Sequence, residues 1–586
     1  MITPATDVSP ESEARPEEDP RVALAKLNPR AAFAPSLPIA SGGLISGLMA
    51  LVFSCVVLAL GLTRSIPDGD SAHQLAELLR DGTRAPGESA LWGWLARQFE
   101  SLPFGPSSAW RIALLSALSA AASAGLLAIW LRRRDIGRRA AIVAALLFAF
   151  SLPVWQSAVV PGSAPLVTAI ALAALVLLEE GLASRRPGPR RLGWALVGVG
   201  MTQGPVAVGA MIAVVALEVL PRGADRQLRP SSFLAFLIGG GLGLIGGGAL
   251  PALSAMPWDP IAPADGIAQV ALLAGPLAVV ALLGVLVLWL KHPGDAGAWT
   301  MLATLPLAAA LIIGPAGGAR LDPASFPAAV PLTFAALAAL AAAAIDALLQ
   351  RFAATPSPRT HALTALAAAV PLGAIVWGAP IADRSDWRYG EDWARSVLQS
   401  LPPDALIFSG SDSRGGLLEW AQLIDGVRPE VVVADPGGQI DPRRSPLLAI
   451  EPVPPSTAGA IDAVRARTER PVFALTPIPT TEGRWSPWGI VWRWGPQLEA
   501  PAAEEKTAWE AVRIRGLPTD PAGARAWIGG ESGTDVQDRT ARRIAADYYQ
   551  ARARRDGMLS QVGPWATVLD RLAELRATSA RRPVTP

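Results

Sequence analysis

Two aspartates lie two residues apart shortly after the first long apolar run of the sequence. Asp68 and Asp70 belong to the stretch SIPDGDSAHQL (65–75), which precedes a tryptophan-containing stretch. A carboxylate close to a bilayer can accept the proton of an acceptor hydroxyl, provided that hydrogen bonds hold it and bound substrate excludes water. Pro-Asp-Gly-Asp is also an ordinary turn sequence, since Asp and Gly supply turn geometry. Two interpretations of Asp68 and Asp70 are therefore open at this point: catalytic carboxylates and residues of an ordinary turn.

The composition indicates a polytopic membrane protein. The 586 residues are 51% hydrophobic and 17% charged, and the mean hydropathy is +0.35. Such a chain is too apolar for an ordinary soluble enzyme and too long for one compact domain. The formal net charge of +2 creates no strong global field. We therefore expect membrane lipids as partners and no nucleic acid.

Cysteine and histidine are too sparse for a disulfide framework or a clustered metal site. Cys55 is the only cysteine, and His73, His292 and His361 are far apart along the chain. A zinc site needs such ligands in clusters. The sequence therefore predicts no metal ligands and no cofactor, and the assistance of a divalent metal stays open.

Nine apolar runs are long enough to cross a bilayer, which takes about 17 to 25 residues. They lie near 44–62, 110–131, 140–160, 164–183, 231–255, 268–290, 298–316, 325–349 and 361–380. Segment 192–220 is interrupted at TQGP (202–205), and because proline removes a backbone donor we predict two half-length helices forming a hairpin. Residues 38–382 are thus predicted to be a polytopic α-helical membrane domain with about eleven membrane elements.

Arginine and lysine predict the orientation of this domain. The basic loops 131–139, 184–191, 221–229, 291–293 and 351–359 all fall on one side of the bilayer. The positive-inside rule assigns that side to the cytoplasm. The first outer loop, 63–109, and everything after residue 381 then lie outside. Residues 1–37 are rich in proline and glutamate and are predicted to be a disordered cytoplasmic tail. No cleavable signal pattern precedes the first run, so we expect a multi-pass protein of the cell (inner) membrane.

The last third of the chain changes character near Pro380. The segments WARSVLQSLPPDALIFSGSD and GLLEWAQLIDGVRPEVVVAD are typical of alternating helix and strand, and RPVFALTPI and GIVWRWG suggest further strands. We predict a soluble, extracytoplasmic α/β domain over 383–535. Ala-rich and Arg-rich segments then predict a helical hairpin and tail over 536–586, which caps that domain.

A short amphipathic helix is predicted inside the first outer loop. Leu91, Trp94, Leu95 and Phe99 recur at helical spacing. Trp92 and Trp94 suit the headgroup layer of a membrane, so the helix is expected to lie on the bilayer surface. Simple anchoring and the handling of a lipid substrate are both compatible with it.

Several stretches resemble one family of membrane proteins. LPFGPSSAWRIALLSALSA (102–120), preceded by PDGDSAHQLAELL, resembles a bacterial family related to vertebrate transmembrane protein O-mannosyltransferases within the GT-C superfamily. FSLPVWQSAVV (150–160) and GVGMTQGPVAV (198–208) are similar to two further membrane segments of that group. LPPDALIFSGSD and GVRPEVVV extend the resemblance into the soluble part, so that it covers most of the chain.

The resemblance implies the inverting transfer of a sugar from a polyprenyl-phosphate carrier to a hydroxyl on the outer face. Serine or threonine of a protein is one acceptor that it suggests. By position, Asp70 would be the catalytic base and Asp68 its helper. Negative charge grows on the leaving phosphate and calls for nearby cations. The substrate-binding candidates are Arg64, His73, Arg84, Arg111 and Gln203. Arg111 equally suits an arginine whose side chain reaches to the membrane surface.

Departures from the family pattern support an alternative. Ala72 and His73 replace the family's Gly-Glu. Arg84 replaces the histidine of His-Pro-Pro-Gly, and Gln203 replaces the lysine of Lys-Gly-Pro. The alternative is a catalytically degenerate GT-C-like protein that acts as a binding or assembly module. A transporter is a third class, because broken helices also occur in carriers, but the apolar runs hold almost no ionisable groups.

Overall fold

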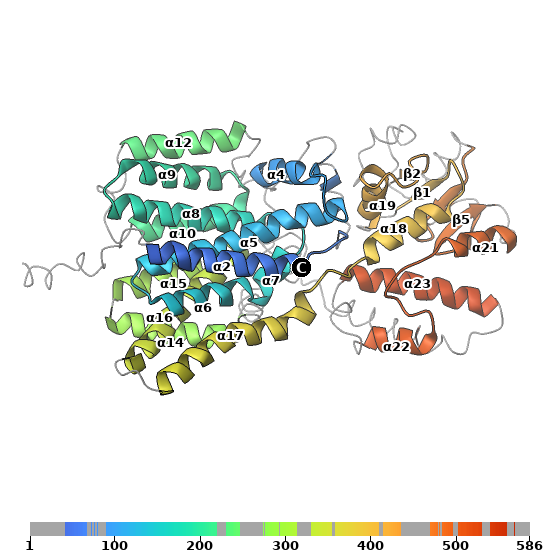
Figure 1. Cartoon of the computed structure of the whole chain (residues 1–586). Coiled ribbons are helices and arrows are strands. Elements are labelled where there is room, and N and C mark those ends of the chain that lie inside the picture. The colour runs from blue at the N-terminus through green and yellow to red at the C-terminus, as the bar shows by residue number, and fades with distance from the viewer. Residues whose placement is uncertain are drawn as a thin grey trace, which may run out of the picture.

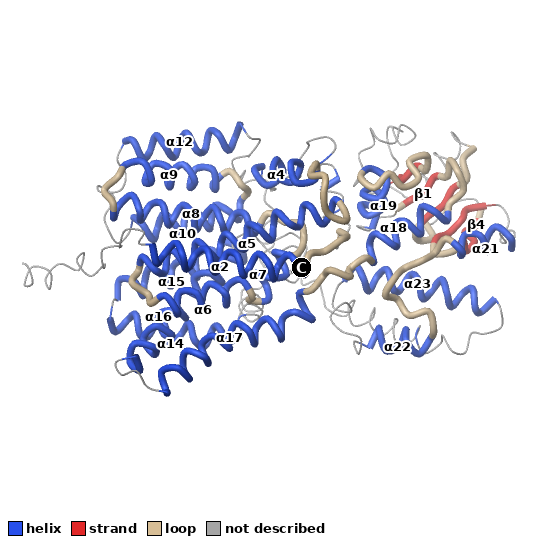
Figure 2. Tube along the Cα trace, in the orientation of Figure 1, coloured by secondary structure: helices blue, strands red, loops and turns tan. Residues whose placement is uncertain are grey.

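The computed structural model describes two regions of different architecture (Figures 1 and 2). The described residues are 41–66, 72, 75–76, 79, 90–219, 230–245, 274, 276–291, 293–312, 330–353, 358–409, 414–434, 469–478, 480, 483–495, 502–529, 539–558 and 568. Helices alone make up the first region, and the strands are confined to the second (Figure 2).

Five described helices are long and apolar enough to cross a bilayer. They are α2 (Ser41–Leu60), α5 (Ser108–Arg133), α8 (Ala164–Ala183), α16 (Val330–Ala353) and α17 (Pro358–Ala382). Shorter apolar helices accompany them: α10 (Pro205–Val219), α12 (Pro230–Ile245), α14 (Pro276–Lys291) and α15 (Pro293–Ile312). The less apolar helix α9 (Pro187–Met201) precedes α10. The described part of the chain thus has the apolar helices of a membrane protein.

The predicted span 140–160 is apolar over its length but is bent rather than one straight helix. It forms α6 (Arg138–Ala149) and α7 (Leu152–Ala158), which are bent by 63° at the break. Pro153 lies in the first turn of α7, where its missing N–H costs nothing, whereas inside a continuous helix it would remove a hydrogen bond. The Ser151 hydroxyl donates to the Phe148 carbonyl at the end of α6 (2.7 Å). The bend is therefore encoded locally.

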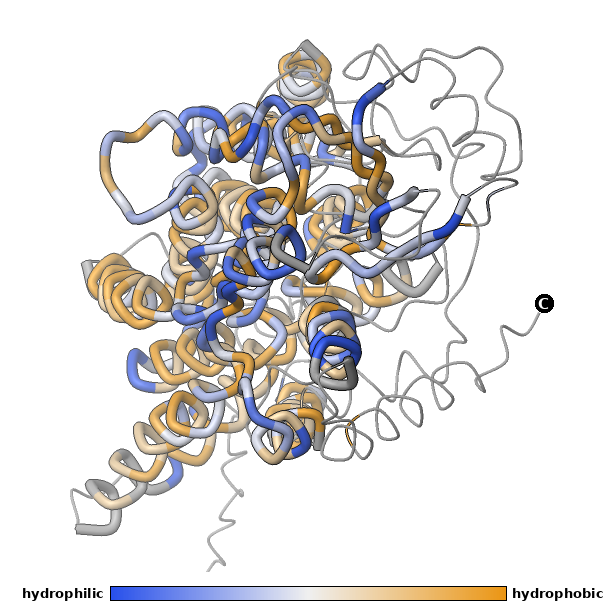
Figure 3. The backbone as a smooth tube through the Cα atoms, turned by 90° about the vertical axis from the view of Figure 1, so that its right-hand side faces the viewer, coloured by the Kyte–Doolittle hydropathy of each residue, from blue (hydrophilic) through white to orange (hydrophobic). Residues whose placement is uncertain are grey.

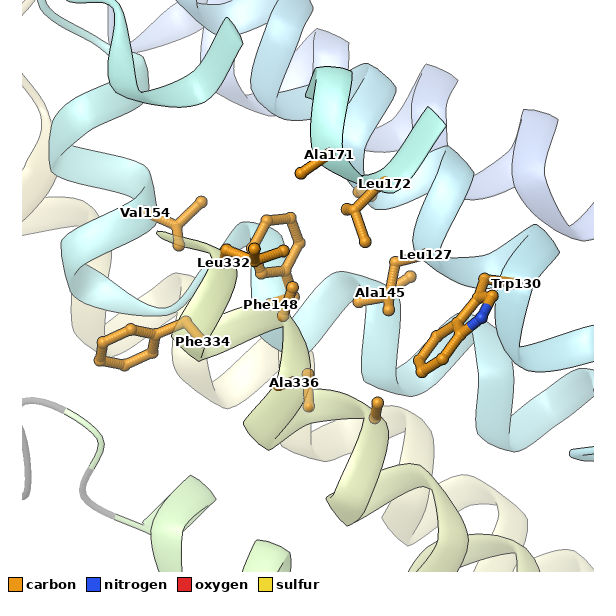
Figure 4. Packing of buried hydrophobic residues seen from close by; sticks show 14 of the residues in the cluster. Leu127, Trp130, Ala145, Phe148, Val154, Ala171, Leu172, Leu332, Phe334 and Ala336 are labelled. Carbon is orange, nitrogen blue, oxygen red and sulfur yellow. The ribbon is translucent and has the colours of Figure 1, made fainter. Parts of the chain in front are cut away.

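The core of the helical region is built from small and aromatic side chains. Trp130 of α5, Phe148 of α6 and Leu332 of α16 are buried, and Figure 4 shows them together with residues of α7 and α8. Alanines and glycines between them allow close backbone approach, as in membrane helix packing generally. The outward sides of α2, α12, α14 and α17 instead expose large apolar side chains, as expected of lipid-facing helices. In Figure 3, hydrophobic residues (orange) predominate in many of the helices.

Buried charges tie the arginine-rich end of the helical region together. Arg134 Nε donates to Glu179 Oε1 (2.8 Å), which also accepts from Trp130 Nε1 (2.9 Å). Arg133 pairs with Glu180. Nearby, Asp346 Oδ1 accepts from the backbone N–H of Gly137 (2.9 Å) at the start of α6, where a negative charge suits the helix dipole. The opposite end of α5 contacts the second region.

A five-stranded mixed sheet forms the centre of the second region. Its order is β2 (Val432–Ala434), β1 (Leu406–Phe408), β3 (Val472–Ala474), β5 (Val491–Gly495) and β4 (Arg484–Trp488). β1 is parallel to β2 and β3, and the pairs β3–β5 and β4–β5 are antiparallel. The predicted strand segments contain β1, β2, β3 and β5, whereas β4 was not predicted. Its Pro487 suits an edge strand, which is where β4 lies.

Five helices accompany the sheet: α18 (Tyr389–Ser400), α19 (Arg414–Leu423), α21 (Ala502–Glu510), α22 (Pro521–Gly529) and α23 (Arg539–Met558). Asp392 of α18 accepts from Arg515 Nε (2.9 Å) and Nη2 (2.6 Å), and Arg414 of α19 pairs with Asp547 of α23. α23 lies in the first half of the predicted terminal hairpin. Apart from Val568, the second half lies outside the described residues.

Candidate active site

Four of the predicted site residues, Asp68, Asp70, His73 and Arg84, lie outside the described residues. The structure does describe the residues that bracket the two aspartates. Ile66 and Ala72 are both buried, with 1% and 0% exposure, in one hydrophobic cluster. The segment that carries Asp68 and Asp70 therefore begins and ends at anchored positions.

Backbone and hydroxyl hydrogen bonds fix the base of the first outer loop. The Thr63 N–H donates to the carbonyl of Val159 at the end of α7 (3.0 Å), and the Arg384 N–H donates to the carbonyl of Gly61 (3.1 Å). Ser65 Oγ accepts from the Glu391 N–H in the first turn of α18 (3.2 Å). Residues 61–66 are thus held between the helical region and the segment that links α17 to α18.

The cluster around Ile66 joins the first outer loop to the α/β region. Leu75 and Ala76 from the loop share it with Tyr389 and Trp393 of α18. Ala109 and Ile112 at the start of α5 belong to the same cluster. Apolar burial is the largest favourable term in protein packing, so the two regions form one structural unit around the base of the loop.

The predicted amphipathic helix of this loop is present as α4 (Ala90–Glu100). Trp94 is 51% exposed, as a residue facing a membrane surface should be. Trp92 is only 3% exposed and packs in the cluster around Ile66, so its predicted place in the headgroup layer is wrong. The spacing Leu91, Trp94, Leu95 and Phe99 does not include Trp92, which is buried in a cluster formed by the loop, α5 and the α/β region.

Gln203 lies at the break between α9 and α10 and is 3% exposed. Its Oε1 accepts from the Leu91 N–H at the start of α4 (2.9 Å), and its Nε2 donates to the Val199 carbonyl (2.9 Å) and to Thr202 Oγ1 (3.0 Å). The side chain predicted to bind substrate therefore connects the helix break to the outer loop. Its role in substrate binding remains a prediction.

Replacing Gln203 by alanine is expected to loosen α4. The Leu91 N–H loses its acceptor in a partly buried position, which costs about 1–3 kcal/mol. Gln203→Lys should have a similar effect, since an ammonium group cannot accept a hydrogen bond. Amide hydrogen exchange at Leu91 measures the change, with Gln98→Ala on the exposed side of α4 as the control. Unaltered exchange in both Gln203 variants would contradict the assigned contact.

Arg111 closes the connection between α4 and α5. Its Nε donates to the Glu100 carbonyl (2.7 Å), its Nη2 donates to Ser108 Oγ (2.9 Å), and the Glu100 carboxylate lies 3.6 Å from Nη2. Arg64, another candidate cation, is exposed, and its carbonyl accepts from Ser107 Oγ (2.6 Å). Both arginines lie at the loop end of α5, and Arg111 has structural partners there.

The stretches that carry the family resemblance meet at this end of the helical region. Ser116 Oγ, within LPFGPSSAWRIALLSALSA, donates to the Gly162 carbonyl (3.0 Å) just after FSLPVWQSAVV. TQGP joins the same end through the contact of Gln203 with α4. Segments far apart in sequence are therefore assembled around the base of the first outer loop.

Glu391, whose N–H donates to Ser65 Oγ, lies close enough to Asp425 for the two carboxylates to interact. Burial and then the nearby Glu391 carboxylate raise the pKa of Asp425 from 3.8 to about 6, and Arg395 opposes the shift. Arg395 is also the ion-pair partner of Glu391 (3.1 Å). Among the described residues, no three His, Cys, Asp or Glu side chains gather closely enough to hold a metal ion.

Stability is expected to fall as the pH rises through the window set by Asp425. Between about pH 4 and 6 the folded state holds a proton that the unfolded state has released, so unfolding becomes easier with rising pH. Asp425→Asn should remove this contribution and raise the midpoint of thermal unfolding above pH 6. The effect should be small, because the surface of Asp425 is exposed and water screens its interactions. Glu391→Gln should weaken the pH dependence without abolishing it. Identical pH profiles for all three proteins would refute the assignment.

Sequence reasoning missed the segment RSDWRYG (384–390), directly after α17. The Arg384 N–H donates to the Gly61 carbonyl just before the first outer loop, and the guanidinium carbon of Arg384 lies over the ring of Trp387, 4.8 Å from its centroid. An arginine and a tryptophan next to the last apolar run were a visible signal of a membrane-surface site. No such signal marked the contact between Arg384 and Gly61, because the two residues are far apart along the chain.

No protein-family model matches the sequence, and no curated protein matches it. Among solved structures, the chain is similar to ArnT from Cupriavidus metallidurans bound to undecaprenyl phosphate, with 16% identity, 68% of this chain and 90% of that chain covered, and a TM-score of 0.44. For ArnT in the apo state the identity is 15%, the coverages are 66% and 89%, and the TM-score is 0.45. A likeness at this level assigns neither a family nor an activity.

Proposed function

We propose that the protein is a membrane glycosyltransferase that moves a sugar from a polyprenyl-phosphate carrier to a hydroxyl group on the outer face of the membrane. The observation that carries this proposal is the anchoring of residues 61–66, which lead directly into Asp68 and Asp70. Hydrogen bonds to Val159, Arg384 and Glu391 hold this segment where the apolar helices meet the α/β region. A reaction between a membrane-bound donor and a water-exposed acceptor needs a base at such a boundary.

The proposed reaction needs one proton acceptor and one stabilised leaving group. The acceptor oxygen attacks the anomeric carbon of the donor, the bond from that carbon to the phosphate oxygen breaks, and the configuration inverts. Asp70 takes the proton of the acceptor hydroxyl, and Asp68 is its helper. Polyprenyl phosphate leaves with the bonding electron pair, and a nearby cation stabilises its growing charge. A protein serine or threonine is the acceptor that the family resemblance suggests.

Release of polyprenyl phosphate tests this function. The purified protein in lipid nanodiscs is given a polyprenyl-phosphate sugar and a panel of hydroxyl acceptors. It should release one polyprenyl phosphate for each glycosylated product that it forms. Heat-denatured protein provides the background. Absence of release across the panel of donors would overturn the proposal.

A second candidate is a catalytically degenerate relative that serves as a binding or assembly module. The internal use of Gln203 and Arg111 as structural contacts favours it, as do the departures at Ala72 and His73 from the family pattern. This candidate predicts binding of polyprenyl phosphate without any sugar transfer. The release assay and a binding assay therefore separate the two.

A further inference from the structure

We propose that the segment between α8 and α9 binds the headgroup of an anionic phospholipid through Arg185, Arg186 and Arg191. The inference comes from a difference between two arginine-rich segments at the same end of the helical region. One of them uses its arginines inside the protein, whereas the other presents them to the surroundings. This end of α8 lies opposite to the end near the first outer loop, so the inference is independent of the proposed function.

The arginines at the end of α5 are engaged by the protein itself. Arg133 pairs with Glu180, and its Nη1 also donates to the Val176 carbonyl (2.7 Å). Arg134 Nε donates to Glu179 Oε1 (2.8 Å). The side chains of the two arginines are only 2% and 5% exposed. These cations therefore hold α5 against α8 and are not offered to a ligand.

The arginines between α8 and α9 have a different environment. Arg185, Arg186 and Arg191 are all exposed. Among the described residues, no carboxylate forms an ion pair with any of the three. The acidic residues nearest to them along the chain, Glu179 and Glu180, are paired with α5. Three positive charges are therefore available to an anionic ligand.

Arg185 and Arg186 closely follow an apolar span. The span of α8 ends at Ala183, and Arg186 follows it by three residues, which reach at most about 11 Å. The hydrocarbon core of a bilayer is about 30 Å thick, and the whole bilayer with its headgroups is about 40–45 Å thick. Phospholipid phosphates therefore lie within several ångströms of the end of such a span, in the layer where these arginines are expected.

Exposed apolar side chains lie at the same end of the molecule as the arginines. Leu192 of α9 is 53% exposed. α12 packs along α9, with Gly239 against Ala195 (Figure 1). Gly243 lies against Thr202, farther along both helices, so the two helices run in the same direction and begin at the same end. The exposed apolar side chains in the first two turns of α12 are Phe233, Leu234 and Leu237.

An anionic phospholipid has the two features that fit this surface. Guanidinium groups bind phosphate oxygens through charge-assisted hydrogen bonds. Acyl chains can lie along the exposed apolar side chains of α9 and α12, as lipid does against any membrane helix. A headgroup with a net negative charge is favoured over a zwitterionic one, because the cation of the latter is repelled by three arginines.

Titration with phosphatidylglycerol tests the inference. The full-length protein is kept in micelles of an uncharged detergent, and native mass spectrometry counts the lipid molecules bound. Phosphatidylglycerol should bind more tightly than phosphatidylcholine, which carries a cation beside the same phosphate. The triple variant Arg185→Gln, Arg186→Gln, Arg191→Gln should bind phosphatidylglycerol about a hundredfold more weakly, since each arginine beside an anionic surface contributes about fivefold. The corresponding triple lysine variant keeps the charges and should keep most of the affinity.

Arg395→Gln is the matched control, because Arg395 is an exposed arginine of the α/β region (44% exposed). It should bind phosphatidylglycerol normally, and an equal loss in this variant would overturn the assignment to one site. Thermal unfolding verifies that each variant is folded. A folded triple glutamine variant that binds as tightly as the unaltered protein would overturn the role of these arginines.

Two further ligands identify what the site recognises. Glycerol 3-phosphate has the phosphate but no acyl chains and should bind far more weakly than phosphatidylglycerol. Equal affinity for the two would overturn the assignment to a membrane lipid. Equal affinity for phosphatidylcholine and phosphatidylglycerol would overturn the preference for an anionic headgroup.

Discussion

Replacing Asp70 by asparagine is expected to lower the turnover of polyprenyl-phosphate sugar by about a hundredfold to ten-thousandfold, the usual contribution of a general base. Asparagine has nearly the same size as aspartate but cannot take the proton of the acceptor hydroxyl. Affinity for the donor should change little, because the base acts on the acceptor. Release of polyprenyl phosphate at saturating donor gives the turnover, and a direct binding assay gives the affinity.

Asp68→Asn is the matched control for Asp70→Asn. It changes the same functional group two residues away, and as a helper Asp68 should affect turnover less than Asp70 does. If Asp68→Asn abolishes turnover and Asp70→Asn does not, the two roles are reversed. Unchanged turnover in both variants would exclude these carboxylates as the base.

Glu179→Ala is expected to destabilise the helical region by about 3–5 kcal/mol, the usual cost of breaking a buried ion pair from one side. Glu179 is fully buried, and its Oε1 accepts from Arg134 Nε (2.8 Å) and Trp130 Nε1 (2.9 Å). Without the carboxylate, an arginine whose side chain is 5% exposed loses its charge partner. Denaturant titration in mixed micelles, followed by tryptophan emission, measures the free energy of unfolding.

Two comparisons separate charge from packing in this prediction. Glu179→Gln keeps an acceptor for Trp130 but loses the charge, so its effect should be smaller than that of Glu179→Ala. Arg395→Ala breaks an ion pair between partners that are 44% and 22% exposed, and such pairs contribute only about 0.3–0.5 kcal/mol. Equal free energies of unfolding for Glu179→Ala and Arg395→Ala would show that the buried ion pair contributes no more to stability than the exposed one.

Hydropathy and local turn chemistry predict much of the helical region. The runs near 44–62, 110–131 and 164–183 correspond to α2, α5 and α8 within a few residues, because lipid requires long apolar segments. The break at TQGP follows from Pro205, which cannot continue the hydrogen-bond pattern of α9. The bend after Ala149 had an equally clear signal in Pro153, and apolar length alone concealed it.

Contacts between distant residues could not be predicted in this way. Gln203 was a binding candidate by position, and only the fold brings its amide to Leu91. Likewise, α4 shows which apolar positions face one side, whereas the burial of Trp92 depends on a cluster made by the α/β region. Arg384 donates its backbone N–H to the carbonyl of Gly61, just before the first outer loop, and these two residues are far apart in sequence. A single sequence gives the elements but not these pairs.

The cluster shared by Ile66, Tyr389 and Trp393 has a consequence for biosynthesis. The ribosome makes the first outer loop and α5 early and the α/β region last, so Ile66 and Ala72 lack the part of their cluster that α18 and later elements supply while the nascent chain is short. A chain that stopped after α17 would keep its apolar helices yet lack the residues that pack the base of the loop. Completion of the polypeptide therefore determines when the loop acquires its final shape.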